Sequence, residues 1–181
     1  MSERLHGFRG EFLWEWDIAE RQLTQLATAF PAAEYEWRPD TAARSVSEVL
    51  VHIACGTFML LEWLGVSVPA DLYAKLPEQP EPRLWAIVRV NDEMEQRVRE
   101  KAKIGSLLSR ALASAREKVL STEDVTLEQS LSFFGETTTV RRVFLRLLAH
   151  TNEHMGQLIA YTRMRGLPAP WPDWRPDRQK P

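Results

Sequence analysis

Four long stretches of the chain repeat apolar residues every three or four positions, which is the spacing of an α-helix with one buried face. They cover residues 8–30, 45–65, 103–120 and 138–165, and polar residues fill their other faces. Residues 84–101 form a further charged, amphipathic stretch. We therefore predict an all-α fold, a four-helix bundle with an extra helical segment between its second and third long helices.

The ends of these stretches carry residues typical of helix boundaries. Ser45 precedes the second stretch, and Glu48 three residues later completes a capping box. Gly166 and Pro168 follow the last stretch and predict its end. Between the third and fourth long helices the pattern is less regular, and residues 133–135 (Phe-Phe-Gly) indicate a turn or a strand-like piece.

Length and charge limit the classes of protein to consider. The 181 residues are predicted to form a single domain, 1–181, and a net charge of -2 gives no reason to expect a nucleic acid or an anionic membrane as partner. The longest uncharged apolar run, 49–61, is too short to span a bilayer. One cysteine and no apolar core of a signal peptide favour a cytoplasmic protein. We expect its partner to be a small-molecule substrate.

The histidines are the residues most indicative of chemistry. The chain has four, and His150 and His154 are spaced so that both imidazoles lie on one side of a helix. His52 lies in the second long helical stretch, and Gly56 one turn later leaves room for an ion or a substrate. Burying imidazoles costs free energy unless their nitrogens find partners, and a divalent cation would satisfy all three.

The pattern alone leaves other interpretations open. A single histidine such as His52 is more often a core residue with a local hydrogen bond, and histidine pairs spaced like 150 and 154 also occur by chance on solvated faces. Cys55, three residues after His52, could complete a closed structural site, although a small buried thiol is more common.

The residues around the histidines resemble the DinB/YfiT-like superfamily of small four-helix metalloproteins. The similar segments are residues 37–39, 45–54, 139–141, 150–158 and 161–171. The resemblance implies an up-down-down-up bundle, a frequent homodimer, and a divalent metal held by His52, His150 and His154. Many members have a histidine where this chain has Glu153, so the resemblance supports no substrate role at that position.

Three neutral imidazoles with a free position are typical of a catalytic metal site, with zinc or nickel as the expected ion and iron or manganese as alternatives. The resemblance favours a metal-dependent S-transferase-like enzyme that activates a low-molecular-weight thiol, such as bacillithiol or mycothiol. Gln157 or Tyr161 would then orient the substrate.

Two alternatives remain. One is a metal-dependent hydrolase using a bound hydroxide, with Glu48 or Glu153 as general base. Glu48 is more simply explained as a cap of its own helix, and Glu153 as a carboxylate that is solvated or supports an imidazole. The other is a non-enzymatic stress protein that binds a metal or a small molecule.

Overall fold

The structure, a computed structural model, describes residues 6–73 and 76–168. Its helices and strands, in chain order, are α1 (Gly7–Ala29), a 3-10 turn (Ala32–Glu34), α2 (Val46–Glu62), α3 (Pro80–Arg97), α4 (Lys101–Ser121), α5 (Asp124–Leu127), β1 (Ser130–Phe133), β2 (Glu136–Thr139) and α6 (Val140–Met164). The predicted all-α fold is confirmed, with a two-stranded hairpin added to it.

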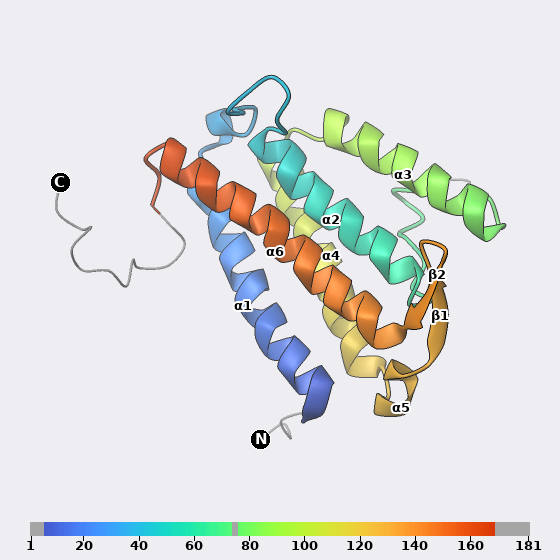
Figure 1. The fold of residues 1–181 in the computed structure, drawn as a ribbon. Helices are drawn as coiled ribbons and strands as arrows, with labels where there is room; N and C mark the ends of the chain where they lie inside the picture. The colour runs from blue at the N-terminus through green and yellow to red at the C-terminus, as the bar shows by residue number, and fades with distance from the viewer. Residues whose placement is uncertain (1–5, 74–75, 169–181) are drawn as a thin grey trace.

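The long helices α1, α2, α4 and α6 form the bundle, and each packs against two of the others (Figure 1). Lys101, at the start of α4, bonds the carbonyl oxygens of Thr28 and Phe30 at the end of α1. At the opposite end, Arg9 pairs with Asp124, which lies just beyond α4. α1 and α6 therefore run one way and α2 and α4 the other, which is the predicted up-down-down-up order.

The helix α3 lies outside this four-helix bundle and packs on α2 (Figure 1). It returns the chain to the end of the bundle where α2 began, so that α4 can run parallel to α2. The helix begins at Pro80, four residues before the predicted start, because proline suits the first helical turn, where no N–H partner is needed.

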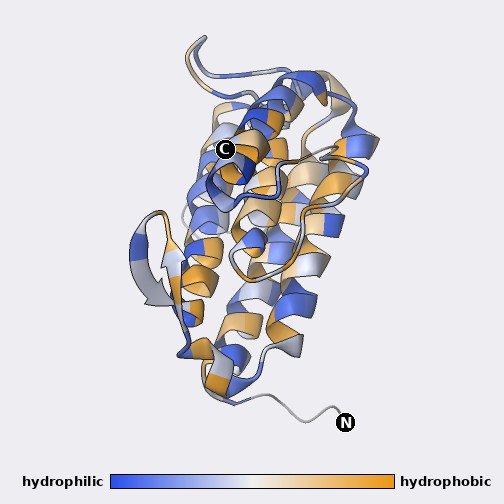
Figure 2. Cartoon of the chain, turned by 90° about the vertical axis from the view of Figure 1, so that its right-hand side faces the viewer, coloured by the Kyte–Doolittle hydropathy of each residue, from blue (hydrophilic) through white to orange (hydrophobic). Residues whose placement is uncertain are grey.

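Apolar faces meet inside the bundle, and along each helix hydrophobic and hydrophilic segments alternate (Figure 2). The fully buried Trp16 stacks on Phe12 and donates its indole N–H to the carbonyl oxygen of Leu112 at 3.2 Å. Phe12 also meets the edge of Phe144, with ring centroids 5.3 Å apart. These contacts fix α6 against α1 and therefore fix which residues of α6 face the core.

The capping box predicted at the start of α2 is present. The Ser45 hydroxyl accepts from the Glu48 N–H, and the Glu48 carboxylate accepts from the Ser45 N–H at 2.8 Å. Because this box defines the first turn of α2, it also fixes the rotation of the helix and the face on which His52, one turn later, lies.

The irregular stretch before α6 is a short helix and a β-hairpin. In its register, Ser130 pairs with Thr139 and Phe133 with Glu136. Both turn residues, Phe134 and Gly135, have positive φ angles of 50° and 85°, as in a type I′ turn. Since residues 138 and 139 belong to β2, α6 begins at Val140, two residues after the predicted start.

Among the described residues, no helix combines the length and the apolar composition that crossing a membrane requires. From the sequence we also expect Trp171 and Trp174, in the proline-rich tail, to pack over the bundle or a partner subunit, but both residues lie outside the described part of the chain.

Candidate metal centre

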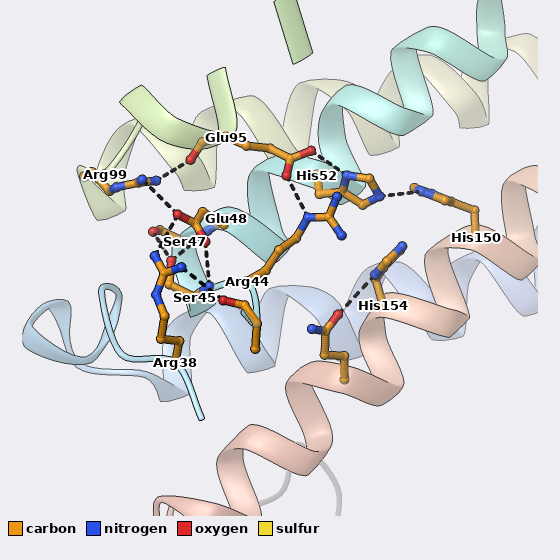
Figure 3. Close-up of polar contacts among 12 residues, drawn as sticks. Arg38, Arg44, Ser45, Ser47, Glu48, His52, Glu95, Arg99, His150 and His154 are labelled. Carbon is orange, nitrogen blue, oxygen red and sulfur yellow. Dashed lines mark hydrogen bonds and ion pairs between the residues drawn. The ribbon is translucent and has the colours of Figure 1, made fainter. Parts of the chain in front are cut away.

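Three histidines from two helices meet between α2 and α6 (Figure 3). One ring nitrogen from each of His52, His150 and His154 lies within 4.8 Å of the other two, and the Nε2 atoms of His52 and His150 are 3.2 Å apart. Two nitrogens bound to one tetrahedral ion at about 2.0–2.1 Å would lie about 3.3 Å apart. His52 and His150 therefore already have the spacing of two ligands of one ion, and His154 lies within 4.8 Å of both.

The burial of the three rings differs. His150 is buried, with 9% of its surface exposed, whereas His52 and His154 are half-buried. His150 shares the buried face of α6 with Val143, Leu147, Leu158 and Tyr161, as the apolar spacing of this stretch predicts. One ring of the cluster is therefore buried in the core, and the other two are partly exposed at its outer edge.

Glu95 of α3 orients the ring of His52. Its Oε1 lies 2.5 Å from Nδ1 of His52, and its Oε2 accepts from Nε of Arg44 at 2.7 Å. A carboxylate only accepts, so Nδ1 of His52 carries the hydrogen and Nε2 keeps a lone pair for a metal. Burial raises the pKa of Glu95, but the bonds from His52 and Arg44 outweigh burial and keep the carboxyl ionised.

Sequence reasoning missed Glu95, although the sequence contains a signal. Ile87, Asn91 and Glu95 follow each other at steps of four residues and are all buried. An acidic residue in register with the apolar face of an amphipathic helix needs a partner, and that partner here is an imidazole.

Gln157 and Tyr161, which the sequence suggested as substrate-orienting residues, form a chain of hydrogen bonds that holds His154. The Gln157 amide donates to the Tyr161 hydroxyl at 2.7 Å, and Tyr161 donates to the carbonyl oxygen of Arg44 at 2.9 Å. The Gln157 oxygen is left to accept from Nδ1 of His154 at 3.2 Å. His154 therefore also presents Nε2 to the cluster.

His150 is oriented by packing. Its Nδ1 is buried without a hydrogen-bond partner in the described part of the protein. Its ring occupies the space beside Gly56, where an added Cβ would lie 2.9 Å from Nε2 and 3.2 Å from Nδ1. The expectation that Gly56 leaves room for an ion or a substrate is therefore wrong, because the imidazole fills that room.

The remaining candidate residues are engaged elsewhere. Glu48 bonds Arg38 at 2.8 Å and Arg99 at 3.0 Å in addition to capping α2. Glu153 is exposed and forms a two-point ion pair with Arg146. Cys55 is buried, lies 4.0 Å from the Met94 sulfur and is not part of the cluster, and burial raises the pKa of its thiol to about 12.

A cavity of about 800 Å³ lies away from the histidines. It opens between the end of α2, the start of α3 and the hairpin, and Trp63, Trp85 and Phe134 are among its lining residues. It shares no residue with the histidine cluster.

The protonation of the cluster suits metal binding at neutral pH. Burial, followed by the charges of His52 and His154, lowers the pKa of His150 from 6.5 to about 3. Burial also lowers the pKa of His154. Both rings are therefore neutral at pH 7, which is the state that binds a metal.

The metal-free protein should lose stability as the pH falls from 7 to 5. The folded state keeps His150 neutral down to about pH 3, whereas the unfolded chain protonates it below about 6.5, so acid favours the unfolded state. The expected loss from this group is about 2 kcal/mol over that range. Urea unfolding at pH 7, 6 and 5 should show a smaller loss in His150→Gln, and an equal loss in both proteins would contradict the assignment.

The fold and the cluster define a class of protein, a four-helix bundle with three histidines gathered between two antiparallel helices. Residues 15–158 match the sequence model of the DinB superfamily, and the chain belongs to that superfamily. No curated protein sequence matches the chain.

Three crystal structures resemble the fold. A DinB-like protein from Bacillus cereus is 18% identical with a TM-score of 0.56, covering 90% of this chain and 95% of that chain. An uncharacterized protein from Clostridium difficile is 14% identical with a TM-score of 0.65, covering 89% and 99%. A conserved protein from Enterococcus faecalis is 19% identical with a TM-score of 0.62, covering 84% and 93%. At these identities the likeness supports the fold alone.

Proposed function

We propose that the chain binds one divalent ion through His52, His150 and His154 and acts as a metal-dependent S-transferase on a low-molecular-weight thiol. The observation that carries the proposal is the convergence of three ring nitrogens within 4.8 Å, two of them on rings whose other nitrogen is held by Glu95 or Gln157. Such outer partners are typical of metal-binding histidines.

The number of ligands favours a site with a free coordination position. In the described part of the chain the cluster contains three histidines and no cysteine or carboxylate as a fourth member. Three protein ligands are the pattern of catalytic zinc sites, whereas structural sites use four. A divalent ion held by three neutral imidazoles keeps its full charge and would stabilise the thiolate form of a substrate thiol.

The surroundings favour thiol transfer over hydrolysis. A hydrolase needs a general base, and both candidates are engaged, Glu48 by the α2 cap and two arginines and Glu153 by Arg146. Ion pairing also lowers the pKa of Glu153, which weakens it as a base. In thiol transfer the ion would favour the thiolate and the thiol proton would pass to solvent, so that the reaction does not depend on a protein carboxylate as base.

The three imidazole donors limit the ion to a few candidates. Imidazole ligands suit zinc and nickel and also accept iron, and manganese is the weakest of the four candidates. The homodimer and the single domain over 1–181 remain predictions.

The test measures conjugation of a thiol panel (cysteine, bacillithiol and mycothiol) to 1-chloro-2,4-dinitrobenzene, in which the sulfur bonds the ring carbon and chloride leaves. We expect turnover by zinc- or nickel-loaded protein, loss after chelation and recovery on reloading. Activity that survives metal removal would contradict the proposal. Ester hydrolysis without a thiol would support the hydrolase, and tight metal binding with no turnover would support a binding protein.

Removing the carboxylate that holds His52 should weaken metal binding. We expect Glu95→Ala to lower metal affinity about 10- to 100-fold, the usual effect of losing such a partner. Glu93→Ala is the matched control, because Glu93 lies on the same helix and is exposed. Competition with a chromogenic chelator measures both affinities, and equal values would show that Glu95 does not support the site.

A further inference from the structure

Arg44 lies at the edge of the histidine cluster and shares one carboxylate with His52 (Figure 3). Its Nε donates to Oε2 of Glu95 at 2.7 Å, while Oε1 of the same carboxylate contacts Nδ1 of His52 at 2.5 Å. The Tyr161 hydroxyl donates to the carbonyl oxygen of Arg44 at 2.9 Å. Both the backbone and the guanidinium of Arg44 are therefore fixed relative to the metal-binding rings.

The guanidinium keeps most of its donors free. Four other arginines each donate hydrogen bonds from two nitrogens to one carboxylate: Arg83, Arg110, Arg146 and Arg165. Arg44 bonds through Nε alone, because His52 already occupies the second oxygen of Glu95. In the described structure its two Nη atoms have no hydrogen-bond partner, and the side chain is 39% exposed.

The free donors lie on the side of the cluster that a substrate would approach. Figure 3 shows the guanidinium beside His52, toward His154, which are the two half-buried rings. A planar guanidinium with two unused nitrogens matches the two oxygens of a carboxylate, and such paired bonds are strong and directional. The positively charged guanidinium beside the exposed edge of the cluster can therefore bind a carboxylate of a substrate whose other group meets the metal.

We propose that Arg44 binds a carboxylate of the thiol substrate, so that among the thiols of the panel above the site favours cysteine, which carries an acid group close to sulfur, over mycothiol, which carries none. The inference rests on the proposed function, since it assumes that sulfur meets the metal. Arg44 acts as a binding residue here and also positions Glu95. The two roles make different predictions, because only binding depends on the charge of the thiol.

The test uses cobalt(II)-loaded protein and follows the thiolate-to-cobalt charge-transfer band in the near ultraviolet. Its probes are 3-mercaptopropionate and its neutral isostere 3-mercaptopropionamide. Each affinity is calculated for the concentration of the thiolate form, so that a difference in thiol pKa between the two probes does not affect the comparison. A charge-assisted hydrogen bond corresponds to about tenfold to hundredfold in affinity, which is the expected preference for the acid. We expect Arg44→Met to reduce the ratio to about one and Arg44→Lys to keep part of it.

Arg110→Met is the matched control, because it removes an arginine from an exposed ion pair with Asp71 outside the cluster. It should keep the full preference. The ratio does not depend on how tightly each variant holds cobalt, since both thiols meet the same ion. A ratio of about one in the wild-type protein, or an unchanged ratio in Arg44→Met, would overturn the inference. Bound cobalt with no band from either thiol would overturn thiol binding itself.

Discussion

Replacing His150 with alanine should abolish tight metal binding. The ring is the most buried of the three proposed ligands, and among the described residues neither Cys55 nor a carboxylate belongs to the cluster and could replace it. Losing a ligand should cost more than losing a supporting partner, so we expect affinity to fall by more than about 100-fold. At an ion concentration near 1,000 times the wild-type Kd, stabilisation by metal should drop from about 4 to about 1.4 kcal/mol or less.

Thermal unfolding with and without zinc measures this loss, together with elemental analysis of the purified proteins. His6→Ala is the matched control, because His6 is the one histidine outside the cluster and is exposed. It should bind metal like the wild-type protein. Full metal content in His150→Ala would mean that the ion lies elsewhere or needs only two of the rings.

Substituting Gly56 of α2 with alanine should displace the ring of His150 on α6 and so weaken metal binding. The new Cβ would overlap the imidazole, and among the described residues Nδ1 has no hydrogen-bond partner that would resist displacement of the ring. Overpacking of this kind costs about 1–3 kcal/mol, and the higher helix propensity of alanine offsets up to about 1 kcal/mol of it. Metal affinity should fall with the displacement of the ligand.

Gly105→Ala provides the comparison, since Gly105 also lies inside a helix but an added Cβ there meets nothing within 4 Å. It should stabilise the protein by about 0.5–1 kcal/mol and leave metal binding unchanged. In the double variant of Gly56→Ala with His150→Ala, the overlap disappears and much of the lost stability should return. A Gly56→Ala protein that binds metal normally would show that the ring does not depend on this space.

The sequence predicted the parts of the fold and site that depend on local rules. The capping box of Ser45 and Glu48, the helical spacing of His150 and His154, and the stop at Gly166 each depend on residues within a few positions of one another. The bundle follows from four amphipathic stretches that must bury one face each.

What could not be predicted depends on contacts between distant residues or on weak local patterns. His52 lies 98 residues from His150 in the chain, and the family resemblance rather than the spacing joined them. Glu95 reaches His52 from α3, whose register the charged sequence defined only loosely. The hairpin has strands of four residues each, too short for a clear alternation.

The central claim is that three imidazoles share one cation and leave part of its coordination sphere free. X-ray absorption spectroscopy of protein loaded with one equivalent of zinc tests it most directly. The predicted spectrum contains three imidazole nitrogens and one further oxygen at about 2.0–2.1 Å, and no sulfur. A sulfur neighbour at about 2.3 Å, or fewer than three imidazoles, would contradict the account.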